Sequence, residues 1–271
     1  MTEYFANLFQ VNQGLITEQA FINEMNNKIK TSLRFNDSMS FTEMSKNILD
    51  PKYAKNYSNV YMKGALIGMS LDILLREESK GAYGVRNMMK DLSKKYGAHK
   101  PFKDDEIIPE IIAMTYPSVG DFFKNHVQGN TPINYAALFE KVGVKKGALE
   151  VDSRYFVNSG NQPFLKLNPK REIIFTEKLN TGLVALGVKA GDVIKAISGE
   201  DITLQNVNAL LIKTFEWEEG DTINIEVVRD GKTMKLEGVA IQPRSVEDGL
   251  ILENLPADNP KAKLRKAWLK G

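Results

Sequence analysis

The spacing of apolar residues along the chain changes near residue 143. Before that point, apolar residues recur every three or four positions, which is the period of an amphipathic helix. From 148 to 243, short runs alternate apolar and polar residues, as strands do. The pattern predicts a multi-domain fold class, with an all-α helical lobe over 1–145 and a small β-rich domain over 148–243. Residues 244–271 lose the strand pattern, so we expect a C-terminal tail with a short basic helix over 258–269.

The helical lobe carries its strongest apolar pattern in residues 56–79. The apolar positions widen from a stripe until they nearly surround the helix, so we expect this helix to be buried on most sides. Tyr61 and Lys63 stand near its start, and Asp72 and Arg76 stand near its end. Tyr61 has two interpretations from the pattern alone. It is a half-buried tyrosine with a structural hydrogen-bond partner, or it is a donor with a function.

The β-rich domain is predicted to contain five strands, two helical segments and a hairpin. The strands are expected over 154–157, 172–176, 192–197, 222–228 and 233–236. A helix over 204–214, with Val207 among its apolar residues, and a helical turn over 181–186 interrupt them. Arg229-Asp230-Gly231-Lys232 is a typical hairpin turn.

Charge and composition exclude several classes of function. The chain has 36 basic and 34 acidic residues and a net charge of +2, which disfavours a nucleic-acid surface or a polybasic membrane patch. No apolar run approaches the roughly 18 residues that a membrane span requires. The first residues lack the basic and apolar regions of a signal peptide. We therefore expect a soluble protein without a membrane span, and the compartment stays open.

Cysteine and histidine counts limit the chemistry further. The absence of cysteine removes disulfides, thiol catalysis and cysteine-ligated zinc. His99 and His126, the two histidines, are 27 positions apart in polar settings, and no H-E-x-x-H motif is present. We expect both histidines in loops or on the surface, and we predict no metal site within this chain.

One resemblance covers residues 148–243. Leu186-Gly187-Val188-Lys189-Ala190-Gly191-Asp192-Val193-Ile194, followed by Ala196-Ile197-Ser198-Gly199, resembles the A-G-L-x-x-G-D-x-I-x-x-I-N-G run of PDZ domains. The order of the expected elements also agrees with that family. The resemblance implies a domain that binds an extended peptide or a protein C-terminus by β-augmentation.

The resemblance also implies where such a peptide would bind. In PDZ domains, a loop with an apolar-Leu-Gly-apolar pattern holds the terminal carboxylate on backbone N–H groups. The matching residues are Phe164, Leu165, Lys166 and Leu167, and Val207 is the candidate on the following helix. Lys166 stands where glycine is usual. Its side chain either blocks the backbone conformation of the anion nest or attracts a carboxylate through its ammonium group.

A second resemblance covers residues 1 to about 143. Its segments, in order, are Thr2-Glu3-Tyr4-Phe5, Tyr61-Met62-Lys63-Gly64-Ala65-Leu66, Asp72-x-x-Leu75-Arg76 and Phe122-Phe123 to Val127-x-Gly129. They are similar to the C-terminal half of the catalytic domain in the glycyl aminopeptidase family. These are gluzincin-type zinc peptidases that carry a C-terminal PDZ domain.

This family implies a zinc site that the chain does not contain. Two histidines of H-E-x-x-H and a later glutamate hold zinc in the family, and by register that glutamate would lie two residues before Met1. The resemblance therefore implies no cofactor in this chain, with zinc in the full-length enzyme. It carries over one catalytic residue, Tyr61, whose counterpart in related gluzincins donates a hydrogen bond to the oxyanion of the tetrahedral intermediate.

We expect from these resemblances a C-terminal fragment of a zinc metallo-aminopeptidase, inactive alone, with a PDZ-like peptide-binding domain. The alternative is a non-catalytic module that binds proteins or peptides. A helical lobe without its other half should also expose an apolar face. Tyr4, Phe5, Tyr57 and Tyr61 are the candidates to line it, and a homodimer through this face is an expected partner arrangement.

Overall fold

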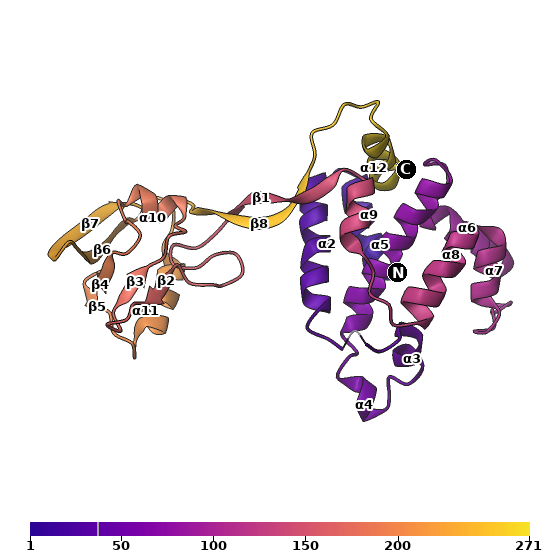
Figure 1. Cartoon of the computed structure of the whole chain (residues 1–271), viewed down its shortest axis with the longest axis horizontal. Helices are drawn as coiled ribbons and strands as arrows, with labels where there is room; N and C mark the ends of the chain where they lie inside the picture. The colour runs from indigo at the N-terminus through magenta and orange to yellow at the C-terminus, as the bar shows by residue number, and fades with distance from the viewer. Residues whose placement is uncertain (37) are drawn as a thin grey trace. The chain divides into compact units, whose positions relative to one another are not determined.

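The chain folds into two compact units, shown with their elements in Figure 1. The computed structural model describes residues 1–36 and 38–271. Unit 1 comprises Met1–Gly147 and Gly249–Gly271, and unit 2 comprises Ala148–Asp248. Each unit has its own buried apolar clusters. The expected combination of a helical part and a β-rich part is therefore confirmed.

Unit 1 is built almost entirely from helices. Its elements are α1 (Thr2–Asn12), α2 (Glu18–Ser32), α3 (Phe41–Lys46), α4 (Pro51–Ala54), α5 (Asn59–Glu78), α6 (Val85–Lys95), α7 (Ile107–Met114), α8 (Pro117–Phe122), the π-helical η1 (Phe123–Gln128), α9 (Tyr135–Lys141) and α12 (Pro260–Lys270). Side chains cap several of them, as the sequence indicates. Thr17 accepts from the N–H of Ala20 at the start of α2, and Ser40 accepts from the N–H of Glu43 at the start of α3.

Helix α5 is the centre of unit 1, and Figure 1 shows other helices of the unit around it. It packs against α1, α2, α6, α8, α9 and α12. Most of its residues are buried, which confirms the expectation for the apolar segment. A Cβ atom on Gly68 would lie 3.2 Å from the Cβ of Tyr4, so this glycine allows the close approach of α1.

A buried hydrogen-bond network ties the first and last helices to α5. Tyr4 Oη donates to Asp72 Oδ2 at 2.5 Å, and Trp268 Nε1 donates to Tyr4 Oη at 2.8 Å. The backbone N–H of Val85, at the start of α6, donates to Asp72 Oδ1 at 2.8 Å. Arg76 Nε lies 3.5 Å from Asp72 Oδ1 as its ionic partner. Because all five residues are buried, these bonds replace water around the carboxylate.

This network corrects the expectation for Tyr4. Tyr4 is 0% exposed and does not line an open apolar face. The reason is that α12 covers it with the Trp268 indole, whose distant position in the sequence gives no local sign of this contact. Burial, and then the charge of Asp72, raise the pKa of Tyr4 well above its ordinary value, so the phenol remains a donor.

The network predicts the effect of removing one hydroxyl. Tyr4→Phe should lower the free energy of unfolding of unit 1 by about 2 kcal/mol, because Asp72 Oδ2 and Trp268 Nε1 each lose a buried partner. Urea unfolding followed by tryptophan fluorescence measures the change. Tyr57→Phe removes an exposed hydroxyl and is the matched control, with a change below about 0.5 kcal/mol. Equal stability of Tyr4→Phe and wild type would contradict the role given to the network.

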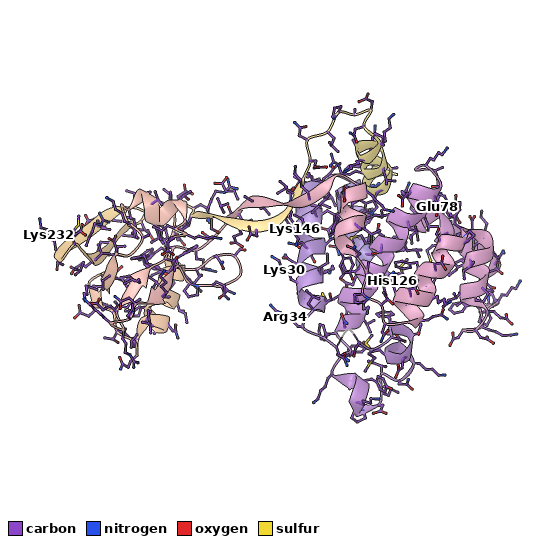
Figure 2. The ribbon with its side chains drawn as sticks, in the orientation of Figure 1. Lys30, Arg34, Glu78, His126, Lys146 and Lys232 are labelled. Carbon is purple, nitrogen blue, oxygen red and sulfur yellow. The ribbon has the colours of Figure 1, made fainter. Side chains whose placement is uncertain are left out.

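Unit 2 is a twisted antiparallel sheet with two short helices. Its elements are β2 (Leu165–Leu167), β3 (Ile173–Phe175), α10 (Thr181–Ala185), β4 (Val193–Ile197), β5 (Glu200–Asp201), α11 (Val207–Lys213), the 3-10 helix η2 (Thr214–Glu216), β6 (Thr222–Arg229) and β7 (Lys232–Val239). The strand order is β2-β3-β4-β6-β7, with β5 paired to β4. Strands β2 and β7 are therefore the ends of that order, and Figure 2 labels Lys232 at the turn of the β6–β7 hairpin.

A buried ion pair fixes the turn before β4. Asp192 is 2% exposed and accepts two hydrogen bonds from Arg229, at 2.7 Å each, and one from the N–H of Lys189 at 2.8 Å. Burial by itself raises the pKa of this carboxyl, but the bonds from Arg229 and Lys189 outweigh it and hold the pKa below its ordinary value. Gly191 has a φ of 84°, which lets the chain turn into β4.

Two sequence expectations for this region are wrong. Residues 154–157 do not form a strand, although Tyr155 and Phe156 are buried, because only Val157 forms a bridge, with Pro163. The strand pattern does not end at Pro243. Strand β8 (Arg244–Leu252) follows and pairs with β1 (Val144–Asp152) in a two-stranded sheet. These two strands carry the chain from unit 1 to unit 2 and back.

Candidate functional site

Tyr61 lies at the start of α5 beside a second tyrosine. Its Oη atom is 3.4 Å from that of Tyr57, and the two rings meet edge to face with centroids 5.9 Å apart. The residues are 44% and 49% exposed. The hydrogen bond and charge of Tyr57 raise the pKa of Tyr61, so its hydroxyl stays protonated. Both tyrosines are thus open to solvent, whereas Tyr4 is not, and the homodimer through this face stays a prediction.

The other polar residues of α5 serve different purposes. Asp72 and Arg76 belong to the buried network that holds α1 and α6 against the helix. Lys63 is 5% exposed. The phenols of Tyr61 and Tyr57 are both exposed at this end of α5, so both can reach a bound molecule. The assignment of Tyr61 as an oxyanion donor stays a prediction.

The described part of the chain offers no ligand set for zinc. No group of three or more His, Cys, Asp or Glu side chains in residues 1–36 and 38–271 is arranged to hold a metal ion. His99 is exposed, and His126 lies in η1 with its Nδ1 2.7 Å from the carbonyl of Thr131 (Figure 2). The residues present therefore do not fit a zinc site, and no catalytic step is derived through zinc.

The peptide-binding candidates of unit 2 lie on β2 and α11. Leu165 and Phe164 are buried in the core of the unit, Leu167 is 51% exposed, and Val207 is partly buried against the same core. Lys166 points its ammonium group to Glu177, at 3.0 and 3.2 Å from the two carboxylate oxygens. The ammonium group already has a carboxylate partner. The role of these residues in binding stays a prediction.

The edge of β2 leaves polar backbone groups open. Thr176 N donates to Phe164 O at 2.8 Å, and Asn168 N donates to Glu172 O at 3.0 Å. Bonded and non-bonded positions alternate along an antiparallel pair. Lys166, midway between Phe164 and Asn168, therefore also lies at a bonded position, opposite Ile174 of β3. The N–H and C=O groups of Leu165 and Leu167 therefore point away from β3, towards the outer side of the strand. Such groups are the template for an added strand.

Two residues beside β2 were not identified by sequence reasoning. Asn158 begins the loop before β2, and its side chain accepts from the N–H groups of Gly160 and Gln162 at 3.0 and 2.8 Å. The Asn-Ser-Gly sequence is a turn signal and could have found it. Glu247 contacts the same loop at Ser159, but it lies 88 positions away in the sequence, and no local pattern indicates that contact.

None of the helices in the described ranges has both the length and the apolar character needed to cross a membrane.

The tyrosine pair predicts a titration experiment. Tyr57→Phe should move the pKa of Tyr61 down towards the ordinary tyrosine value of about 10, because the hydrogen bond and charge of Tyr57 are removed. Carbon-13 labelling of the tyrosine rings and an NMR titration at alkaline pH measure the change. Tyr83→Phe is the control, because Tyr83 is bonded to Asp91 and not to this pair. An unchanged Tyr61 pKa in Tyr57→Phe would show that the hydroxyls do not interact.

No known protein-family profile matches the sequence, and no curated protein matches it. Among solved structures, the chain is similar to the aminopeptidase N family protein from Idiomarina loihiensis, with 23% sequence identity and a TM-score of 0.54. The similarity covers 99% of this chain and 47% of that one, so this chain spans about half the length of that protein. The fold of this chain is therefore aminopeptidase-related.

Proposed function

We propose that the chain is the helical lobe and the PDZ-like domain of an aminopeptidase-type zinc peptidase. In this proposal it binds extended peptides through unit 2 and does not hydrolyse them by itself. The observation that carries the binding function is the open edge of β2, where Leu165 and Leu167 present their backbone groups outwards.

The peptidase part of the proposal is supported by fold and by resemblance. The aminopeptidase-related fold extends over 99% of the chain, and the segments around Tyr61 and Asp72 are similar to those of glycyl aminopeptidases. In an intact enzyme, the exposed Tyr61 hydroxyl would donate to an oxyanion that develops at a reacting carbonyl. Zinc would polarise that carbonyl when bound, and its ligands would belong to polypeptide outside this sequence.

The peptide-binding part is supported by the geometry of unit 2. An added strand gains affinity from main-chain hydrogen bonds, and its alternate side chains give specificity. Leu165 and Leu167 lie on one side of β2 in this alternation, with Lys166 between them on the other. The exposed Leu167 offers an apolar contact to one peptide side chain, and Val207 of α11 is the candidate for the next.

The alternative function is a non-catalytic module that binds peptides or proteins. Unit 2 favours it, because this unit has its own core and an open strand, β2, at the end of its strand order. The two functions differ in the DNA upstream of the first codon. An in-frame H-E-x-x-H sequence that continues into Met1 supports the peptidase, and a stop codon with a ribosome-binding site supports the module.

A hydrolysis assay tests the proposal that the chain is inactive by itself. The chain with added zinc should release no product from a glycyl-coumarin substrate above the rate of zinc alone. The reason is that the described residues contain no cluster of three or more His, Cys, Asp or Glu side chains that could hold a metal ion. Fluorescence measures the release. Tyr61→Phe is the matched variant and should give the same rate. Turnover that Tyr61→Phe abolishes would contradict the proposal that the chain is inactive by itself.

A proline substitution tests the edge of β2 as the binding edge. Leu167→Pro should abolish binding to peptides selected from a displayed library, because proline removes an outward N–H group and its ring obstructs the incoming strand. The fold should persist, since that N–H group makes no bond to β3. Biolayer interferometry measures binding, and circular dichroism checks the fold.

The control is Val239→Pro on β7, at the opposite end of the strand order. Val239 is 61% exposed, and its neighbour Ala240 makes the inward bond, with its N–H 2.7 Å from Asp221 O. Binding should survive this change. Retained binding in folded Leu167→Pro would exclude β2 as the binding edge.

A further inference from the structure

The loop before β2, residues 158–164, has no free backbone donor. The N–H groups of Asn158, Asn161 and Phe164 donate to the carbonyls of Gln162, Asn158 and Phe156, at 2.9 to 3.0 Å. The side-chain oxygen of Asn158 receives the N–H groups of Gly160 and Gln162. Pro163 has no N–H group. The remaining donor, Ser159, is also bonded, so every amide of this loop has a partner within unit 2.

The partner of Ser159 is a carboxylate from the same chain. Glu247 accepts the Ser159 N–H at 2.9 Å on one oxygen and the Ser159 hydroxyl at 2.7 Å on the other. The hydroxyl of Ser245 also donates to Glu247, at 2.9 Å. The carboxylate that the Ser159 donors bind is therefore intramolecular.

The four residues that match the apolar-Leu-Gly-apolar pattern form no nest either. Leu165–Leu167 is a strand, and successive N–H groups of a strand point to opposite sides. Three consecutive N–H groups cannot converge on one anion in that geometry. Lys166 does not supply the missing charge, because Glu177 neutralises its ammonium group.

The charge around the loop opposes a carboxylate as well. A hollow of about 520 Å³ lies beside Phe164, and its walls include Glu177, Glu247, Asp248 and Lys178. Glu177 is balanced by Lys166, so the other charged walls are Glu247 and Asp248 against Lys178, and this excess of acidic groups makes the hollow unfavourable for a further negative charge.

We infer that unit 2 binds extended segments internal to a polypeptide, and that a free C-terminal carboxylate contributes nothing to recognition. The inference rests on the proposed peptide-binding function and names its ligand class. The open N–H and C=O groups of Leu165 and Leu167 pair with the backbone of such a segment, which continues past both ends of β2. A chain end is not required, because the loop at the start of β2 is already closed by Glu247.

Two peptide libraries with the same random sequence test this inference on the whole chain. One library displays peptides with a free C-terminal carboxylate, and the other displays them between two flanking domains. We expect the flanked library to be enriched. Synthetic peptides with the enriched sequence, made as the free acid and as the C-terminal amide, should bind with affinities that agree within about twofold.

Each other outcome counts against a specific claim. Enrichment restricted to the free-ended library, or an amide that binds more than about tenfold more weakly than the acid, overturns the inference and leaves peptide binding intact. Enrichment from neither library, or enriched peptides that bind Leu167→Pro as well as wild type, overturns the proposed function itself.

Discussion

A carboxylate removed from water determines how unit 1 is assembled. Asp72 is 1% exposed, so its two oxygens must be served by the protein. The donors are the phenol of Tyr4 in α1 and the backbone N–H of Val85 at the start of α6, and Arg76, one turn further along α5, is the ionic partner. Trp268 of α12 supports the phenol in turn. One charge thereby links four helices, α1, α5, α6 and α12.

Unit 2 depends on the same requirement in a different form. The backbone amides of the loop before β2 pair within the unit, whereas those of Leu165 and Leu167 face outwards at the edge of β2. In the loop before β2, the carboxylate of Glu247 accepts the N–H group of Ser159, so the anion that this amide binds belongs to the same chain. In the proposed function, the edge of β2 receives a strand and this loop receives no chain end. Specificity in such an arrangement depends on side chains along the bound segment rather than on its terminus.

Local patterns predicted much of this structure. The apolar segment at 56–79 gives α5, and Thr17 and Ser40, which are residue types that favour the N-cap, cap α2 and α3. The Gly-Asp sequence before β4 gives the turn at Gly191. The bond from Arg229 to Asp192 in that sequence was not foreseen. What the sequence did not reveal depends on distant pairs. Tyr4 is covered by Trp268, which is 264 positions away, and Ser159 donates to Glu247, which is 88 positions away.

The chain leaves unit 1 in β1 and returns to it in β8, so unit 2 is an insertion and not an extension. Synthesis on the ribosome proceeds from the N-terminal to the C-terminal side, and domains generally fold as their residues emerge. Residues 148–248 are complete while α12 has still to be made. Unit 1, whose helices α1 and α5 precede unit 2 in the sequence, is consequently the later of the two units to finish folding, because Tyr4 and Asp72 wait for the indole of Trp268.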